Sequence, residues 1–453
     1  MSAPTTILSP QYRGATLGFF GLAFMVAYST AAITTAMPQA ARDLDGLPLY
    51  GLAFGITMAA SVVSMTLAAI WIDRAGPQKP LLTGVSIYVV GMVWAAFAPS
   101  MEMLVAARAL TGLGSGLDGV ALYVGIARVF PAHLRPKMFG ALAAAWLLPS
   151  IVGPALSGVV TDHFGWRWVF GTVPLLAVMA VIMVYRGSRG TGMNKPAHDV
   201  AAGPVAAGAQ RLWVKPLWAL AASVSVLALG DAGARTNGWW PAELGIAVVV
   251  LAFAVTKLLP KGTWRATRGL PSLILMRGFM GTAFTIADVY LPLYMIDQRN
   301  LPAWLAGLSL TVGGVTWAVG AWLSARGKLK PAQSLHWGAA FMLLGMLIAT
   351  LVLLPGWPVW IAWLGWAFAG FGIGVAYPTQ SVLVLSESPP SEQGANASAL
   401  QLSETLLTAT SLAVVGAVFA ALLAFGEAGF VMAFGVACTL GVGTLLISRR
   451  AGA

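Results

Sequence analysis

Three acidic residues stand inside long apolar segments of this sequence, where a charged side chain is least expected. Asp118, Asp288 and Glu404 lie well within such segments, whereas the other acids fall at segment ends or between segments. A charge at the centre of an apolar layer costs about 3 kcal/mol or more, so each of these acids is a candidate for function. A carboxyl group there can stay neutral until water or a cation reaches it. These positions therefore favour the binding and release of protons.

One of these acids belongs to a polar stripe that also contains an arginine. Arg108, Thr111, Ser115 and Asp118 are spaced by three, four and three residues, which confines them to about 80° of a helix surface at roughly 100° per residue. Arg108 and Asp118 are then about 15 Å apart along the helix axis, too far for a direct ion pair. Each charge needs another partner or water, and Thr111 and Ser115 are candidate contacts for a bound molecule.

Each acid also has a purely structural interpretation. Asp288 lies four residues before Pro292 and could cap backbone groups near a proline kink. Glu404 follows Gln401 by about one helical turn, and the two could form a hydrogen-bonded pair between helices. Asp118 could close a salt bridge with a base near the end of its helix. The sequence leaves these alternatives open.

Another arginine and three aromatic residues also lie inside apolar segments. Arg277 lies about one and a half turns into its segment, so we expect its side chain to extend to the nearest segment end. Trp317 and Tyr377 lie deeper, where they either fill the core or stack on an amphipathic ligand. Tyr28, inside the first segment, is a further candidate for a ligand contact.

The segments that carry these residues are predicted to be membrane helices. The chain has 453 residues, of which 58% are hydrophobic and 9% charged, whereas soluble proteins carry about a quarter charged residues. Runs of about 20 apolar residues, the length that crosses a bilayer, recur from end to end. The expected fold class is all-α integral membrane with 14 transmembrane helices. These helices are expected at 14–37, 50–71, 81–98, 102–126, 139–161, 166–185, 213–231, 240–259, 272–295, 303–324, 333–354, 358–379, 394–424 and 428–447.

The basic residues indicate how these helices are oriented. Of the 26 Lys and Arg residues, 20 fall on the side of the N-terminus, four on the other side, and Arg108 and Arg277 inside helices. Because cytoplasmic loops carry an excess of Lys and Arg, both termini are expected in the cytoplasm, at a bacterial-type inner membrane. The net charge of +11 then reflects topology, and we expect no nucleic-acid partner.

The chain divides into two halves that resemble each other. The glycine motif at 112–116 is echoed at 370–374, and residues 71–80 and 37–38 are echoed at 322–331 and 291–292. Three echoes in the same order indicate a duplicated six-helix unit, a recognised plan among transporters. The expected domains are two six-helix bundles, joined by a cytoplasmic linker and an inserted helix pair. They are expected at 1–186, 187–212 for the linker, 213–260 for the inserted pair, and 261–453.

The loop between the second and third helices contains Asp73-Arg74-Ala75-Gly76 with Lys79. It is similar to the Asp-Arg-x-Gly-Arg-Lys motif of the major facilitator superfamily, and the chain resembles specifically the 14-helix drug:proton antiporter branch of that family. The resemblance implies a gate on the cytoplasmic side. Pro77 and Gln78 depart from the pattern because they replace basic residues.

Two helical motifs extend this resemblance to nearly the whole chain. The stretch from Arg108 to Gly114 resembles the family's intramembrane Arg-x-x-x-Gly-x-Gly signature, whose arginine is implicated in proton coupling. Gly153-Pro154 and Gly158 in the fifth helix resemble the antiporter motif. The inserted helix pair also matches that branch.

The resemblance implies a proton-coupled exporter of amphipathic small molecules, working by alternating access as a monomer in the lipid bilayer. Asp118 and Asp288 would face one central site and, with Glu404, bind the protons, and Arg108 would be the counter-charge. The proton gradient would supply the energy, without a cofactor or metal. Export of a lipid or glycolipid, or proton-coupled symport of a metabolite, uses the same fold and stays open. An enzyme is not expected, because no nucleophile with a base and no metal cluster is evident.

Overall fold

The protein is built from helices. The computed structural model describes residues 6–131, 133–187, 193, 214–232, 240–260, 262–327, 329–389 and 392–451, and these residues contain no strand. Their α-helices are α1 (Arg13–Asp43), α2 (Tyr50–Ala75), α3 (Gln78–Ala96), α4 (Met101–Val129), α5 (Arg135–Phe164), α6 (Trp166–Gly187), α7 (Val214–Ala232), α8 (Trp240–Leu258), α9 (Leu270–Asp297), α10 (Ala303–Ala325), α11 (Pro331–Thr350), α12 (Trp360–Glu387), α13 (Gln393–Leu422) and α14 (Ala428–Ala451).

Each of the 14 predicted helices is present, and the clearest differences lie near prolines. α1 continues past Pro38 to Asp43, and α12 continues past Pro378 to Glu387, whereas the sequence predicted ends at residues 37 and 379. A proline inside a membrane helix is tolerated because neighbouring helices and Ser or Thr side chains satisfy the freed backbone groups. These prolines therefore do not mark helix ends.

Twelve of the described helices are long and apolar enough to cross a membrane, so the chain is a multi-pass membrane protein. The apolar parts of α7 and α8 are shorter, at Pro216–Leu229 and Gly245–Leu258. A crossing needs about 17–25 apolar residues, so a total of 14 crossings stays a prediction. The predicted linker at 187–212 lies outside the described residues except for its first residue and Met193.

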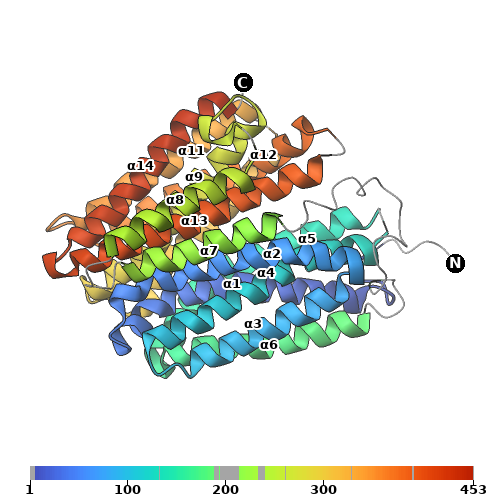
Figure 1. The fold of residues 1–453 in the computed structure, drawn as a ribbon, viewed down its shortest axis with the longest axis horizontal. Coiled ribbons are helices and arrows are strands. Elements are labelled where there is room, and N and C mark those ends of the chain that lie inside the picture. The colour runs from blue at the N-terminus through green and yellow to red at the C-terminus, as the bar shows by residue number, and fades with distance from the viewer. Residues whose placement is uncertain are drawn as a thin grey trace.

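The helices form two groups with the same internal packing. In the first group α1 packs against α5 and α6, both α2 and α3 pack against α4, and α3 packs against α6. In the second group α9 packs against α13 and α14, both α10 and α11 pack against α12, and α11 packs against α14. Figure 1 shows the first group below and the second above. We call them the N-bundle (α1–α6) and the C-bundle (α9–α14). The exact domain limits given by the sequence stay predictions.

The two glycine motifs occupy equivalent places in the bundles. In the motif at 112–116, a methyl group on the first or third glycine would collide with α2, and one on the middle glycine would collide with α3. In the motif at 370–374, the first and third glycines face α10 and the middle one faces α11 in the same way. Helix backbones approach this closely only at small residues. The echo in the sequence is therefore a structural equivalence of α4 and α12.

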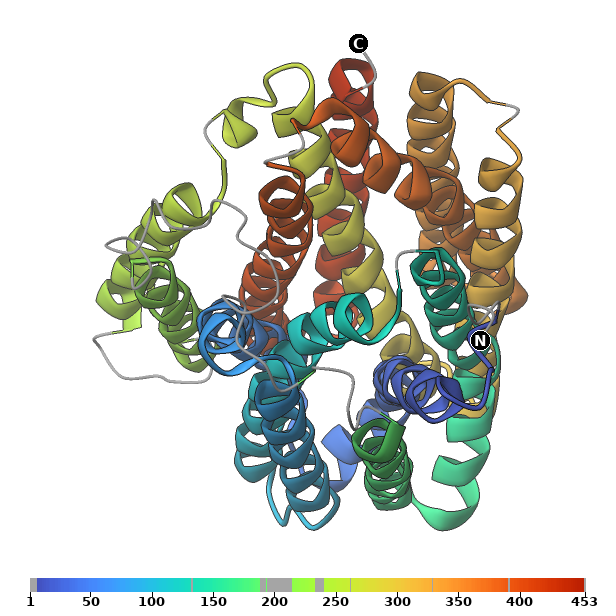
Figure 2. The same cartoon turned by 90° about the vertical axis from the view of Figure 1, so that its right-hand side faces the viewer.

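The hairpin of α7 and α8 lies across the seam between α2 and α13. Figure 2, which views the molecule from the side of the N-terminus, shows it in yellow-green beside these two helices. Ala59 of α2, Leu406 and Ala409 of α13 and apolar residues of the hairpin form one buried cluster. Ser223 of α7 also donates a hydrogen bond to the Ala59 carbonyl at 2.6 Å. The hairpin thus contacts both bundles.

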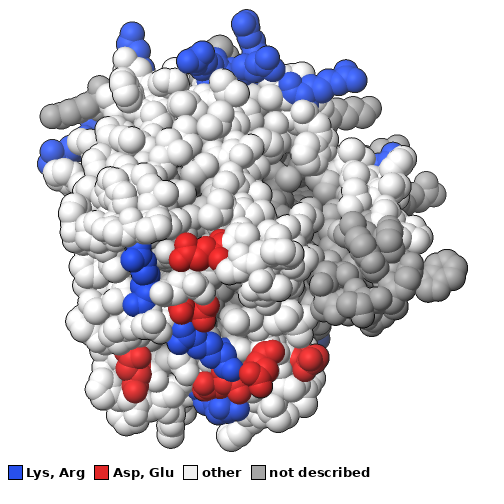
Figure 3. All heavy atoms as spheres, turned by 90° about the vertical axis from the view of Figure 1, so that its left-hand side faces the viewer, with Lys and Arg blue, Asp and Glu red and all other residues white. Residues whose placement is uncertain are grey.

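The start of α1 and the end of α14 lie at the same end of the helix bundles. At the other end, Arg42 near the end of α1 lies 3.1 Å from Asp297 at the end of α9, and Glu427 before α14 accepts a hydrogen bond from Tyr294 of α9 at 3.4 Å. α1 therefore begins, and α14 ends, at what we call the termini end. Figure 3 shows the opposite end, where acidic and basic side chains lie close together, while further basic side chains are visible along the upper edge of the view. That the termini end faces the cytoplasm stays a prediction.

Candidate functional site

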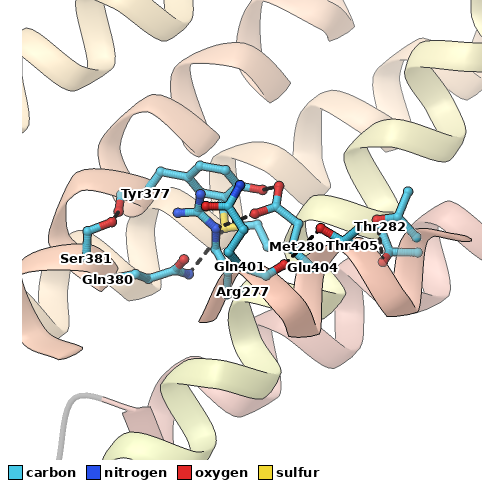
Figure 4. Close-up of polar contacts among 10 residues, drawn as sticks. Arg277, Met280, Thr282, Tyr377, Gln380, Ser381, Gln401, Glu404 and Thr405 are labelled. Atoms are coloured by element: carbon cyan, nitrogen blue, oxygen red, sulfur yellow. Dashed lines mark hydrogen bonds and ion pairs between the residues drawn. The ribbon is translucent and has the colours of Figure 1, made fainter. Parts of the chain in front are cut away.

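An ion pair lies inside the C-bundle. Nε of Arg277 on α9 donates to Oε2 of Glu404 on α13 at 2.7 Å. Tyr377 of α12 donates its hydroxyl to the other oxygen of that carboxylate at 3.0 Å. The Arg277 guanidinium also lies over the Tyr377 ring, 3.4 Å from its centre (Figure 4). Three helices thus meet at one charge-compensated group, which we call the Arg277 cluster.

This cluster corrects two expectations from the sequence. Arg277 does not extend to the membrane surface, because its side chain is 18% exposed and bonded to Glu404. Glu404 does form hydrogen bonds between helices, but its partners are Arg277 of α9 and Tyr377 of α12, and no described bond joins it to Gln401. A bond between two charged groups is stronger than one to a neutral amide. Gly281 permits this approach, because a methyl group there would lie 2.7 Å from the Tyr377 hydroxyl.

Polar atoms without partners surround the ion pair. Nη1 of Arg277, Oε1 of Gln380 and Oγ of Ser403 are buried and have no hydrogen-bond partner among the described residues. The amide nitrogen of Gln380 reaches only the sulfur of Met280, at 3.8 Å. Buried polar atoms are normally paired with protein or water. The cluster therefore offers donors and acceptors to water or to the polar part of a ligand.

An aromatic row extends from the Arg277 cluster. The rings of Tyr377 and Trp317 lie edge to face at 5.6 Å, and those of Trp317 and Phe284 at 5.7 Å. Phe284 stacks on Trp366 at 4.8 Å. The sequence had singled out Trp317 and Tyr377 but missed Phe284 and Trp366, because an aromatic residue in an apolar run does not reveal which way it points. Such a row can pack against the apolar part of a ligand.

In the N-bundle, the polar stripe of α4 faces the protein interior as its spacing predicted. Arg108 is 7% exposed, and its Nε donates to the carbonyl of Ala53 on α2 at 3.3 Å. The hydroxyls of Thr111 and Ser115 donate to carbonyls of α4 itself, at 2.8 and 3.0 Å. Arg108 makes no ion pair with a described residue. Its guanidinium is thus held by a backbone oxygen of α2 and lies within electrostatic range of Tyr88 on α3.

Asp118 is buried without a basic partner. Its side chain is 2% exposed, and Oδ1 has no hydrogen-bond partner among the described residues. It interacts electrostatically with Tyr88 of α3, whose hydroxyl is hydrogen-bonded to Ser29 of α1. The salt bridge to a base near the helix end, which the sequence left open, is not formed with a described residue. Burying an unpaired carboxylate is expensive, so this position favours a bound proton.

Asp288 lies near the contact between the bundles. It is within electrostatic range of Tyr50 on α2. Tyr50 donates its hydroxyl to the Val289 carbonyl at 2.8 Å and lies edge to face with Tyr290 at 5.8 Å. No described contact joins Asp288 to Asp118, so a single site shared by the two acids stays a prediction.

The antiporter-like motif of α5 lies at the seam with α10. A methyl group on Gly158 would collide with the backbone of Trp304, and one on Gly307 of α10 would collide with the Pro154 carbonyl. A methyl group on Gly153 would instead approach α1, at 3.6 Å from the ring of Tyr28. The motif therefore allows α5 and α10 to meet backbone to backbone, while Tyr28 lies on the neighbouring helix.

Charged residues join the two bundles at the opposite end. Asp162 of α5 accepts the backbone amides of Ala303 and Trp304, each at 3.0 Å. Arg42 bonds to Asp297 and to the Ile296 carbonyl. Between described residues, the hydrogen bonds that join the two bundles lie in this half of the molecule. Sequence analysis did not single out Asp162, because its partners are backbone amides, which no residue type reveals.

The loop motif lies at the termini end. Gly76 follows α2 with a φ of 75°, and its amide donates to the carbonyl four residues earlier at 2.9 Å. This backbone conformation favours glycine. Asp73 interacts electrostatically with Arg128 near the end of α4, while Arg74 and Lys79 are exposed. The motif thus ties α2 to α4, and its role as a gate stays a prediction.

Comparison with known sequences agrees with this architecture. The sequence model described as Major Facilitator Superfamily matches residues 19–411. A Mycobacterium tuberculosis protein named probable multidrug-efflux transporter is 28% identical over 430 residues, which cover 91% of this chain and 88% of that protein. Multidrug resistance protein 3 of Bacillus subtilis is 23% identical over 320 residues, which cover 68% of this chain and 60% of that protein.

Comparison with solved structures gives the same fold. A POT family transporter in complex with a thioalcohol-conjugated peptide aligns with a TM-score of 0.72 at 16% identity, over 99% of this chain and 97% of that one. A D-xylose-proton symporter aligns with a TM-score of 0.65 at 16% identity, over 99% and 98% of the two chains. At these identities the likeness shows the fold alone.

Proposed function

This chain belongs to the major facilitator superfamily, and we propose that it exports amphipathic small molecules in exchange for protons by alternating access, as a monomer. The observation that carries the proposal is Asp118, a buried carboxyl group with an unpartnered oxygen in the polar stripe of α4. The relatives named as multidrug-efflux and multidrug-resistance proteins support amphipathic compounds as the substrates.

Asp118 lies at a depth where a proton and a substrate would compete. Val129, the last residue of α4, follows it by about three helical turns, so Asp118 lies about 16 Å from the termini end along the helix axis. An unpaired carboxylate at this depth costs several kcal/mol, so it holds a proton until water or a cation reaches it. A cationic substrate entering from the termini end would supply that charge and displace the proton. Competition of this kind is what antiport requires.

The contacts between the bundles suit one state of an alternating-access cycle. Asp162 with the first amides of α10, and Arg42 with Asp297, hold the bundles together at the opposite end. With the termini end in the cytoplasm, this is the state that accepts a substrate for export. Rocking of the bundles would break these contacts and leave the packing inside each bundle unchanged.

The Arg277 cluster would form the second wall of the site. Because Arg277 neutralises Glu404, a bound molecule would meet no net charge there, but would meet the aromatic row and the free Nη1 of Arg277. Apolar rings with a few polar atoms suit an amphipathic molecule. Protonation of Glu404 would release Arg277, so Glu404 and Asp288 stay in the proposal as further proton sites.

Transport in proteoliposomes tests the proposal. We expect a lipophilic cation to accumulate when a pH gradient is imposed, and Asp118→Asn to abolish this dependence on the gradient. Asp288→Asn tests the other acid in the same assay. Asp45→Asn, which changes an exposed acid at the opposite end, is the matched control and should behave like the wild type. Equal transport by all four proteins without a gradient would contradict proton coupling.

One observation favours proton-coupled symport of a polar metabolite as the second candidate. The free atoms of Arg277, Gln380 and Ser403 offer two donors and one acceptor within the C-bundle. The same proteoliposomes distinguish the two functions, because antiport and symport change the pH of the vesicle interior in opposite directions when a substrate gradient is imposed.

A further inference from the structure

A groove on the C-bundle lies apart from the proposed transport site. It forms at the termini end, where the first turns of α11 meet the last turns of α14, and its volume is about 370 Å³. The proposed transport mechanism uses none of its lining residues. These residues are Ala332, Gln333, His336, Trp337, Ser448 and Arg449.

The groove is basic and its polar groups are held in place. No acid lines it, and the exposed Arg449 makes no ion pair with a described residue. The Ser448 hydroxyl donates to the Leu445 carbonyl at 2.7 Å, and its oxygen lies 3.1 Å from Nδ1 of His336, within hydrogen-bonding distance. This contact orients the imidazole ring. Because Arg449 is a cation and no acid lines the groove, the groove suits an anion.

Exposed apolar side chains continue from the groove along the same two helices. Trp337, which lines the groove, is 53% exposed, and Leu344, two turns further along α11, is 45% exposed. On α14, Leu446 and Val442 precede Arg449 by three and seven residues, on the same helix face, and are 59% and 44% exposed. An anion site at the helix ends thus lies directly above a lipid-facing apolar surface, with a tryptophan at the level of the interface.

We propose that this groove binds the phosphate headgroup of an anionic phospholipid from the leaflet at the termini end. Arg449 faces the phosphate oxygens, and the acyl chains lie along the exposed side chains of α11 and α14. Free phosphate would offer the same oxygens but would leave the apolar surface unused, so the structure favours the lipid. Basic pockets between membrane helices recognise anionic headgroups in this way.

Native mass spectrometry of the purified full-length protein tests the proposal, with phosphatidylglycerol and phosphatidylcholine of identical acyl chains. We expect the wild type to retain phosphatidylglycerol in preference. Arg449→Gln should bind it about fivefold more weakly, the factor for one basic residue at an anionic surface. Arg449→Lys should keep most of the binding. Arg450→Gln removes an exposed charge that does not line the groove and should bind like the wild type.

Three results would overturn the proposal. Equal losses in Arg449→Gln and Arg450→Gln would show a general effect of surface charge and no site. Equal retention of the two lipids by the wild type would show that the headgroup charge is not recognised. A stabilisation against thermal unfolding by inorganic phosphate as large as that by phosphatidylglycerol would replace the lipid by phosphate as the ligand.

Discussion

Arg277 and Glu404 are separated by 127 positions in the sequence, yet their side chains bond at 2.7 Å inside the C-bundle. The two side chains are 18% and 27% exposed, so both charges are largely withdrawn from water. Tyr377 holds the carboxylate from the other side. The three helices α9, α12 and α13 therefore share one electrostatic contact, and each charge depends on the other.

Removing one charge of this pair is expected to destabilise the protein more than removing both. Arg277→Gln or Glu404→Gln leaves a single, mostly buried charge, which should lower the free energy of unfolding by about 2 kcal/mol. That is less than the ~3–5 kcal/mol of a fully buried pair, because water still reaches both groups. The double variant is neutral again and should regain more than half of the loss. Thermal unfolding in detergent gives the order, and a double variant no more stable than either single variant would contradict this account.

Asp162→Ala should loosen the contact between the bundles at the opposite end. The carboxylate caps the first turn of α10 from the other bundle, and such a cap contributes about 1 kcal/mol, or roughly a fivefold change in an equilibrium. We expect a cysteine at Gln39, which lines a groove at this end, to react about five times faster with an impermeant thiol reagent in a Cys438→Ser background. Asp45→Asn, which keeps a residue type that tolerates the φ of 49° at this position, is the control, and equal rates in the two variants would show that Asp162 does not hold the contact.

Gly158→Ala should impair transport far more than Gly140→Ala, although both glycines lie on α5. A methyl group at Gly158 would collide with the backbone of Trp304, whereas one at Gly140 meets nothing within 4 Å. Because a helix backbone cannot retreat as a side chain can, we expect closure at the opposite end to be lost and transport to fall more than tenfold. Gly140→Ala should be neutral or slightly stabilising, by about 0.5–1 kcal/mol. Distances between spin labels on α5 and α10 measure closure directly, and unchanged distances in Gly158→Ala would refute the argument.

The sequence was sufficient for the order of the helices and for the twelve that are long and apolar enough to cross a membrane, because apolar length reports such helices directly. It also predicted the equivalence of α4 and α12, since small residues mark the places where helix backbones meet. Helix ends near Pro38 and Pro378 were predicted less well. A proline breaks a helix in water, but in a membrane bundle the neighbouring helices satisfy the freed groups.

The partners of the site residues could not be predicted in the same way. Asp118 was visible because an acid inside an apolar segment is rare, but its lack of a partner depends on what α3 and α1 place around it. Arg277 was expected at the membrane surface, since the sequence does not show that Glu404 lies beside it. The partners of Asp162 are backbone amides, which every residue carries. The type of a residue thus indicates which side chains could bind a proton, whereas the partner of each side chain depends on how the helices pack.

The α7–α8 hairpin contacts both bundles, and a rocking movement cannot leave both contacts unchanged. α7 is hydrogen-bonded to α2 through Ser223 and the Ala59 carbonyl, whereas the hairpin meets α13 through apolar residues such as Leu406 and Ala409. Apolar surfaces can slide past each other, whereas sliding of α7 along α2 would break this bond between helices and leave the Ser223 hydroxyl only the Ala219 carbonyl of its own helix, at 2.9 Å. We therefore expect the hairpin to move with the N-bundle and to slide over α13.

Engineered disulfides can decide which bundle carries the hairpin. In a Cys438→Ser background, which removes the single native cysteine, Ser223→Cys with Ala59→Cys joins α7 to α2 and should leave transport unchanged. Val226→Cys with Leu406→Cys joins residues of the cluster shared by α7 and α13 and should reduce transport at least tenfold until the bond is reduced. Each pair is its own control, with and without reductant. The reverse result, with transport arrested only by the bond to α2, would assign the hairpin to the C-bundle and place the sliding surface on α2.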